Sequence, residues 1–92
     1  MNKQEQILMI TAEESAEVIQ EISKIFRFGI DGNHKSGIKH RAKLEEEIGD
    51  LVCMIELLVE HEMIDQENVN VAAQNKRDKL KVYSNIFDKD LA

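Results

Sequence analysis

KLEEEIGDLVCMIELLVE, residues 43–60, is the stretch that decides the fold. Apolar side chains recur in it every three or four residues, which predicts an amphipathic helix that packs against a neighbour. Glu47 and Asp50 lie three residues apart at the border of this apolar face, so their carboxylates point the same way. Because a buried charge is costly unless an opposite charge or a metal ion compensates it, this pattern indicates a cation-binding role. The apolar positions are Leu44, Ile48, Leu51, Val52, Ile55, Leu58 and Val59.

The composition predicts an all-α protein. The chain has 92 residues, no proline and only four aromatic side chains, whereas strands favour aromatic and β-branched residues. We expect a single domain, residues 1–92, without repeats or an internal linker. A domain of this size buries little of its surface, so oligomerisation is the expected supplement to its core.

Outward from the central stretch, the pattern predicts an antiparallel helical hairpin plus a third helix. The first helix is expected over residues 4–28, although Thr11 and Glu14 have capping-box spacing, and a helix starting there would leave 4–10 as a separate turn. Residues 29–37, GIDGNHKSG, have the composition of a loop. Asp65 is the expected N-cap of the third helix. The predicted inward face of that helix comprises Val69, Ala72, Ala73, Leu80, Tyr83 and Phe87.

Net charge and apolar run lengths restrict the partners. The formal net charge of −6 disfavours nucleic acid or an anionic membrane as the main partner. The apolar runs fall far short of the ~20 residues that span a bilayer. The first residues lack the apolar stretch of a signal peptide, so we expect a cytoplasmic protein. Cys53 is expected to be a packed core thiol, and the three histidines surface or loop residues.

Two acidic pairs stand on the two helices of the expected hairpin. Glu14/Glu17 and Glu47/Asp50 share the spacing of three, and antiparallel helices joined by one loop can bring them face to face. Carboxylate ligands alone favour a hard ion, Mg²⁺ or Mn²⁺. The Glu-x-x-His motif of a bundle di-iron site is missing. A solvated acidic face is the plainer interpretation of any single pair.

Basic residues near the acidic pairs favour a polyphosphate substrate. Mg²⁺ keeps waters and takes phosphate oxygens as ligands, lowers the pKa of a bound water, and leaves a nearby carboxylate to take the proton. The expected reaction is therefore hydrolysis. The basic residues in question are Lys39, Lys43, Lys76 and Lys79.

Three segments resemble the MazG-like all-α nucleoside triphosphate pyrophosphohydrolases, whose signature is ExxE on one helix and ExxD on the next. They are EESAEVIQ (13–20), SKIFRFG (23–29) and LEEEIGDLV (44–52), with a looser match at 75–83. The resemblance implies cleavage between the α and β phosphates of (deoxy)nucleoside triphosphates, giving nucleoside monophosphate and pyrophosphate. It also implies a homodimer or homotetramer, in which helices of two subunits form a four-helix-bundle-like unit.

The same resemblance implies roles for particular residues. Apart from the resemblance, we expect a metal-bound water to attack, with Glu46 or Glu17 as the assisting base. The implied Mg²⁺ ligands are Glu14, Glu17, Glu47 and Asp50. The implied phosphate or sugar contacts are Lys24, Arg27, Asn75, Lys76 and Lys79. Two alternatives stay open: another phosphorylated substrate, such as an alarmone, a phosphoribosyl compound or a nucleotide-sugar, and a non-enzymatic helical interaction protein.

Overall fold

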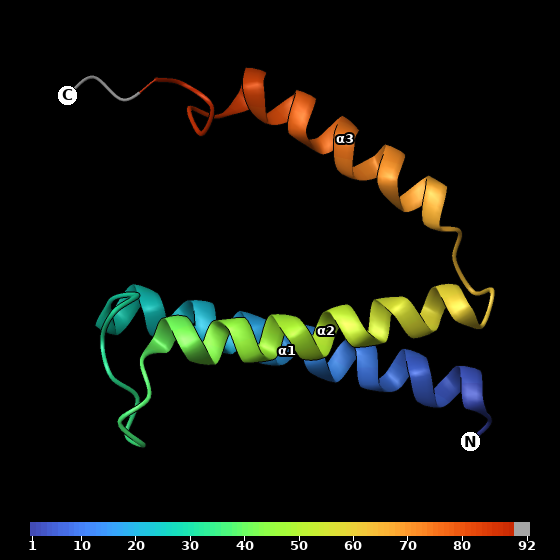
Figure 1. The fold of residues 1–92 in the computed structure, drawn as a ribbon, viewed down its shortest axis with the longest axis horizontal. Coiled ribbons are helices and arrows are strands. Elements are labelled where there is room, and N and C mark those ends of the chain that lie inside the picture. The colour runs from blue at the N-terminus through green and yellow to red at the C-terminus, as the bar shows by residue number, and fades with distance from the viewer. Residues whose placement is uncertain (90–92) are drawn as a thin grey trace.

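The computed structural model describes residues 1–89 and contains three helices in that range. They are α1 (Lys3–Phe28), α2 (His40–Glu60) and α3 (Gln66–Tyr83). Figure 1 shows α1 and α2 lying side by side as a hairpin, with α3 leaving its open end. The described residues form no strand, which confirms the prediction of an all-α protein.

α1 is one continuous helix of 26 residues, as the long-helix alternative predicted. Its start is fixed by a capping box in which Asn2 Oδ1 accepts the Glu5 N–H at 2.8 Å and Glu5 Oε1 accepts the Asn2 N–H at 3.2 Å. Thr11 does not cap a helix, because its hydroxyl donates to the Ile7 carbonyl at 2.7 Å inside α1. At the other end Gly29 takes φ +86°, a conformation that favours glycine, and the helix stops.

The loop between the hairpin helices determines where α2 begins. Lys39 is the N-cap and makes no side-chain capping bond. Instead, the first two helical N–H groups, of His40 and Arg41, donate to the carbonyls of Gly32 and Ile30, each at 2.9 Å. The loop therefore satisfies donors that a capping side chain would otherwise take. It also extends α2 three residues ahead of the stretch that the apolar pattern picked out.

The hairpin has a small apolar core near its open end. Ile7, Met54 and Leu58 are the buried apolar residues, with Leu57 and Met63 packed against them. Farther along the seam the buried residues are polar, so the two helices enclose charge as well as hydrocarbon. Ile48, Val52 and Cys53 were expected to lie in the core, and this was wrong. Ile48 and Val52 are about half exposed, and Cys53 is exposed rather than a core thiol. The buried face of α2 passes beside these three positions.

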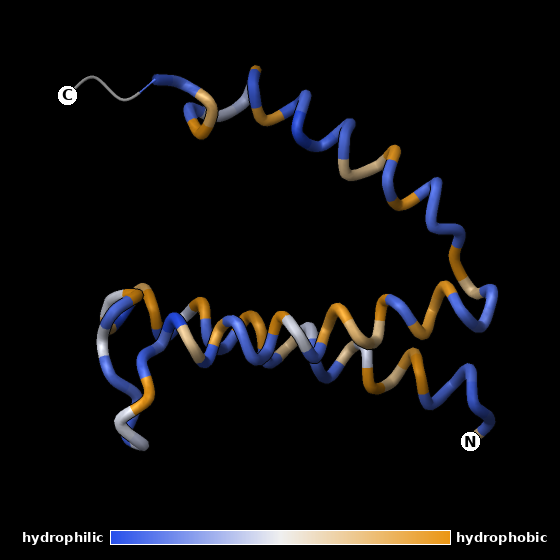
Figure 2. Tube along the Cα trace, viewed as in Figure 1, coloured by the Kyte–Doolittle hydropathy of each residue, from blue (hydrophilic) through white to orange (hydrophobic). Residues whose placement is uncertain are grey.

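α3 begins where predicted but does not pack on the hairpin. Asp65 Oδ1 accepts the Asn68 N–H at 3.0 Å, which confirms the N-cap. None of its residues is buried, and the expected inward face is not covered by α1 or α2. The radius of gyration of 16.4 Å exceeds the ~12 Å of a compact chain of this length. Figure 2 shows that α3 is mostly hydrophilic with scattered apolar positions.

None of the helices within residues 1–89 has an apolar stretch of the length and hydropathy that a membrane span requires.

Candidate functional site

Three carboxylates converge in the middle of the hairpin seam. Glu14 comes from α1, and Glu47 and Asp50 come from the facing turns of α2. One oxygen of each lies within 4.8 Å of the others. The antiparallel pairing of two helices, each with its acids on one flank, produces this arrangement.

Glu17 joins these residues from the next turn of α1. Its carboxylate is close enough to Glu47 for the two groups to share a hydrogen bond through a proton. Glu17 is exposed, as is Asp50, whereas Glu47 is buried and Glu14 half-buried. We call Glu14, Glu17, Glu47 and Asp50 the acidic cluster; it opens to solvent on the side of Glu17 and Asp50.

Burial and mutual repulsion both act on the acidic cluster. Burial raises the pKa of Glu47, and the charges of Glu17, Asp50 and Glu14 raise it further. Burial likewise raises the pKa of Glu14, followed by the charges of Asp50, Glu17 and Glu13. Both carboxyls therefore hold their protons to higher pH than an ordinary glutamate does.

The chemistry of the acidic cluster fits a hard divalent cation. Glu14 Oε2 is enclosed without a hydrogen-bond partner. None of the ion pairs among residues 1–89 involves a member of the cluster. Oxygen ligands, excess negative charge and an orphaned buried oxygen together match the ligand preference of Mg²⁺ or Mn²⁺.

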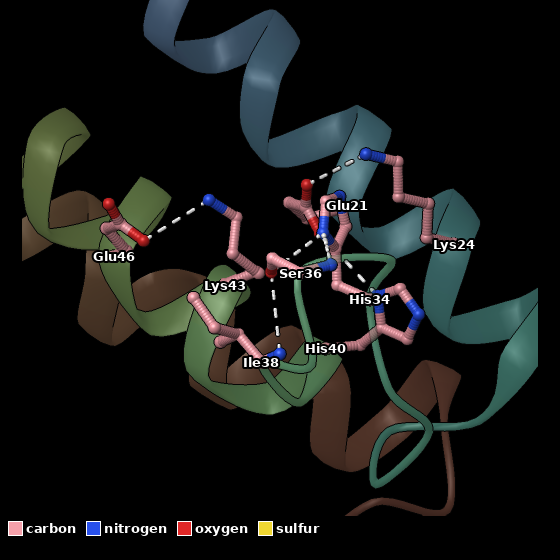
Figure 3. A network of polar contacts seen from close by, with 8 residues as sticks. All are labelled: Glu21, Lys24, His34, Ser36, Ile38, His40, Lys43 and Glu46. Atoms are coloured by element: carbon pink, nitrogen blue, oxygen red, sulfur yellow. Dashed lines mark hydrogen bonds and ion pairs between the residues drawn. The ribbon is translucent and has the colours of Figure 1, made fainter.

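Glu46, the second residue expected as a base, lies apart from the acidic cluster. Its side chain is largely exposed, and its Oε2 pairs with Lys43 Nζ at 3.4 Å. Figure 3 shows this ion pair between Lys43 and Glu46. Glu17, by contrast, lies within hydrogen-bonding reach of Glu47 in the acidic cluster.

The expected substrate contacts divide between the hairpin and α3. Lys24 Nζ bonds Glu21 Oε1 at 3.1 Å, and the Arg27 guanidinium lies 5.0 Å from the centre of the Phe28 ring. The other expected contacts lie on α3, which makes no extensive contact with either hairpin helix, so this chain alone does not bring them to the acidic cluster. They are Asn75, Lys76 and Lys79.

A second buried polar group, which the sequence analysis did not single out, lies at the loop end of the hairpin. Glu21 is 5% exposed and His40 2% exposed, so the expectation of a surface or loop histidine was wrong for His40. Glu21 Oε2 and His40 Nδ1 lie 3.9 Å apart, and neither has a hydrogen-bond partner. Figure 3 shows these side chains with Lys24 and His34. The available signal was the position of Glu21, one heptad after Glu14 on the same face of α1.

Comparison with known families agrees with this geometry. The family model described as the MazG nucleotide pyrophosphohydrolase domain matches residues 2–81. Among curated proteins and solved structures, none matches the chain.

Proposed function

The chain belongs to the MazG nucleotide pyrophosphohydrolase family, and from this membership we propose that it hydrolyses (deoxy)nucleoside triphosphates between the α and β phosphates in a Mg²⁺-dependent reaction. The products are a nucleoside monophosphate and pyrophosphate. The observation that carries the proposal is the acidic cluster, in which Glu14, Glu47 and Asp50 place oxygens within 4.8 Å of one another.

Glu14, Glu17, Glu47 and Asp50 are the residues that would hold Mg²⁺, with Mn²⁺ as an alternative. When bound, such an ion neutralises phosphate charge and makes a water molecule more acidic. Without a cation, the acidic cluster would repel a polyphosphate, since no basic side chain in the described part of the chain is paired with it. A polyphosphate can therefore bind at the acidic cluster only together with a cation.

Proton transfer is the role proposed for Glu17. It is the exposed member of the acidic cluster on α1, so it can reach water outside the seam, and it lies within hydrogen-bonding reach of Glu47. A carboxylate within hydrogen-bond reach of the attacking water acts as general base. Glu46 is the alternative base, which would first have to leave Lys43.

Substrate contacts are proposed for Lys24 and Arg27 on α1, and for Asn75, Lys76 and Lys79 on α3. For the α3 residues we propose a homodimer or homotetramer, in which α3 of one copy lies near the hairpin of another. Large apolar side chains are exposed on both the hairpin and α3, where a second copy of the chain could cover them. Those on the hairpin include Ile19, Ile22, Phe26, Ile48 and Val52, and those on α3 include Val71, Val82 and Tyr83. A cytoplasmic location accords with the proposed substrates.

The deciding experiment is a panel of ribo- and deoxyribonucleoside triphosphates with pyrophosphate release as the readout. We expect Mg²⁺-dependent release, reduced more than about 100-fold in Glu47→Gln, since even outer-shell partners of a metal site are worth about 10- to 100-fold. Glu56→Gln, at an exposed position of α2 outside the acidic cluster, is the matched control. Release of inorganic phosphate instead would place the cleaved bond elsewhere.

Hydrolysis of alarmones, phosphoribosyl compounds or nucleotide-sugars in place of triphosphates would favour the alternative substrate classes. If no phosphorylated compound is cleaved, and Mg²⁺ shifts the Tm of wild type and Glu47→Gln equally, the protein is a helical interaction protein and the proposal is wrong.

A further inference from the structure

Glu21 and His40 form a buried pair to which the proposed hydrolysis assigns no role. Glu21 Oε1 is taken by Lys24, while Oε2 faces His40 Nδ1 at 3.9 Å, and both of these atoms are enclosed without a partner. Two orphaned polar atoms are costly unless they bond each other. A proton on Nδ1 provides that bond after a small closing movement. The imidazole is then held as the Nδ1–H tautomer.

This tautomer leaves Nε2 with a free lone pair. Within residues 1–89, His40 Nδ1 is enclosed without a hydrogen-bond partner, and the one ion-pair contact of the ring, with Glu21, is made by Nδ1 and not by Nε2. The ring borders a hollow of about 360 Å³. Figure 3 shows Nδ1 turned toward Glu21 and the rest of the ring turned away from it. Nε2 is thus a hydrogen-bond acceptor at the wall of the hollow.

The walls of the hollow suit a flat ligand that also carries negative charge. The Phe28 and His40 rings stack with centroids 5.7 Å apart and an interplanar angle of 16°. Lys24 and Lys35 add positive charge, and Asn33 and His34 complete the lining.

A larger hollow of about 530 Å³ lies at the turn between α2 and α3, bordered by no member of the acidic cluster.

The hollow lies on the same flank of the hairpin as the acidic cluster. Glu14, Glu17, Glu21, Lys24 and Phe28 follow one another by three or four residues, and so form one stripe on α1. Seven residues separate Glu17 from Lys24, and seven separate His40 from Glu47, or about 10 Å along either helix. A nucleotide with its phosphates at the acidic cluster can extend its other end into the hollow.

We propose that His40 Nε2 accepts a hydrogen bond from the nucleoside part of the substrate, and that Glu21 is the positioning residue that holds the ring for this contact. The inference rests on the proposed function. The group recognised is an N–H or O–H donor, either a sugar hydroxyl or an amino group of the base. A site built around such an acceptor rejects an analogue that lacks the donor, because the acceptor is then left unpaired.

The first test needs no substitution and no catalysis. Long-range ¹H–¹⁵N NMR of the full chain reports which ring nitrogen of His40 carries the proton. We expect Nδ1–H in the wild type, and movement of the Nε2 signal when AMP or dAMP is added in the presence of Mg²⁺. A proton on Nε2, or a signal that neither nucleotide moves, overturns the proposal. In Glu21→Gln, whose amide can donate to Nδ1, we expect the proton to shift to Nε2.

The second test uses kcat/KM in two substrate comparisons: each ribonucleoside triphosphate against its 2′-deoxy counterpart, and each amino-bearing base against an analogue without the amino group. His40→Phe keeps a ring to stack on Phe28 and removes Nε2. We expect one of the two preferences to fall about tenfold or more. Loss of the first preference identifies a sugar hydroxyl, and loss of the second identifies a base amino group.

Controls separate recognition from folding. Arg41→Ala removes the exposed ion pair with Asp31 at the same end of α2 and should leave both preferences intact. If His40→Phe is too unstable to assay, His40→Leu, which likewise carries no hydrogen-bond acceptor, takes its place. Unchanged preferences in the folded variant overturn the proposal. A wild type that cleaves no nucleoside triphosphate refutes the proposed function instead, and the NMR titration still decides whether His40 accepts a bond from a nucleotide.

Discussion

Replacing Glu47 by glutamine should stabilise the protein in EDTA while abolishing its stabilisation by Mg²⁺. Glu47 is 9% exposed and lies among three other carboxylates. Glutamine has nearly the same shape, carries no charge, and its amide can donate to a neighbouring carboxylate. The substitution therefore removes repulsion without opening a cavity.

The magnitude follows from the spacing in the acidic cluster. Two unit charges 4.8 Å apart repel by about 0.9 kcal/mol in water. Several such neighbours act on Glu47, but solvent screening and proton uptake remove part of the repulsion. The net gain on losing the charge is on the order of 1–2 kcal/mol. For a chain of this size, that corresponds to a rise in Tm of about 5–10 °C.

Calorimetry of wild type, Glu47→Gln and Glu56→Gln, in EDTA and in about 1–10 mM Mg²⁺, measures both effects. We expect Mg²⁺ to raise the Tm of wild type and of Glu56→Gln, but not of Glu47→Gln. A Glu47→Gln protein that melts below wild type in EDTA would refute the repulsion argument. An equal response to Mg²⁺ in all three proteins would refute the assignment of the cation to the acidic cluster.

Three further outcomes are expected. The pKa values of Glu14 and Glu47 are raised above 4.5, so the stability gained on their protonation is complete below about pH 4.5 and is lost as the pH rises through the raised values. Calorimetry in EDTA should therefore show the wild-type Tm falling from that pH toward neutrality. The fall should be shallower in Glu47→Gln. Leu58→Ala should cost roughly 2–3 kcal/mol in urea unfolding, since Leu58 is one of the buried apolar residues, whereas Leu8→Ala at a half-exposed position should cost much less. If copies associate through the exposed apolar surface, wild-type Tm should rise with protein concentration, and Phe26→Glu should remove that dependence; a constant wild-type Tm would contradict the proposed oligomer.

The sequence predicted the parts of the fold that local signals determine. α1 was expected over 4–28 and spans Lys3–Phe28, and the N-cap of α3 was identified from Asp65 alone. The start of α2 was placed too late, because its first turn is basic, where helices favour acids, and Lys39 gives no side-chain cap. The loop carbonyls that satisfy this helix end cannot be identified from residue types.

The candidate site was predictable in outline, because two acidic pairs, each with a spacing of three residues on its own helix, come together once the helices form a hairpin. Its finer geometry was not predictable. Ile7 is buried, yet Ile10, three residues further along α1, is 39% exposed, since the rotation of each helix depends on its partner. The Glu21–His40 pair depends in turn on the early start of α2. The predicted inward face of α3 finds no partner within one chain.

The uneven filling of the hairpin seam bears on its dynamics. Apolar contacts hold the end near Ile7 and Leu58, whereas acidic and mixed polar groups occupy the rest. Segments with few buried apolar contacts open locally at the lowest free energy. Amide protons near the apolar end should therefore exchange slowest, and those around Glu14 and Glu21 earlier. A divalent ion bound at the acidic cluster would reduce this difference in exchange rate between the two ends of the hairpin. The rigidity of the hairpin would then depend on the concentration of free cation.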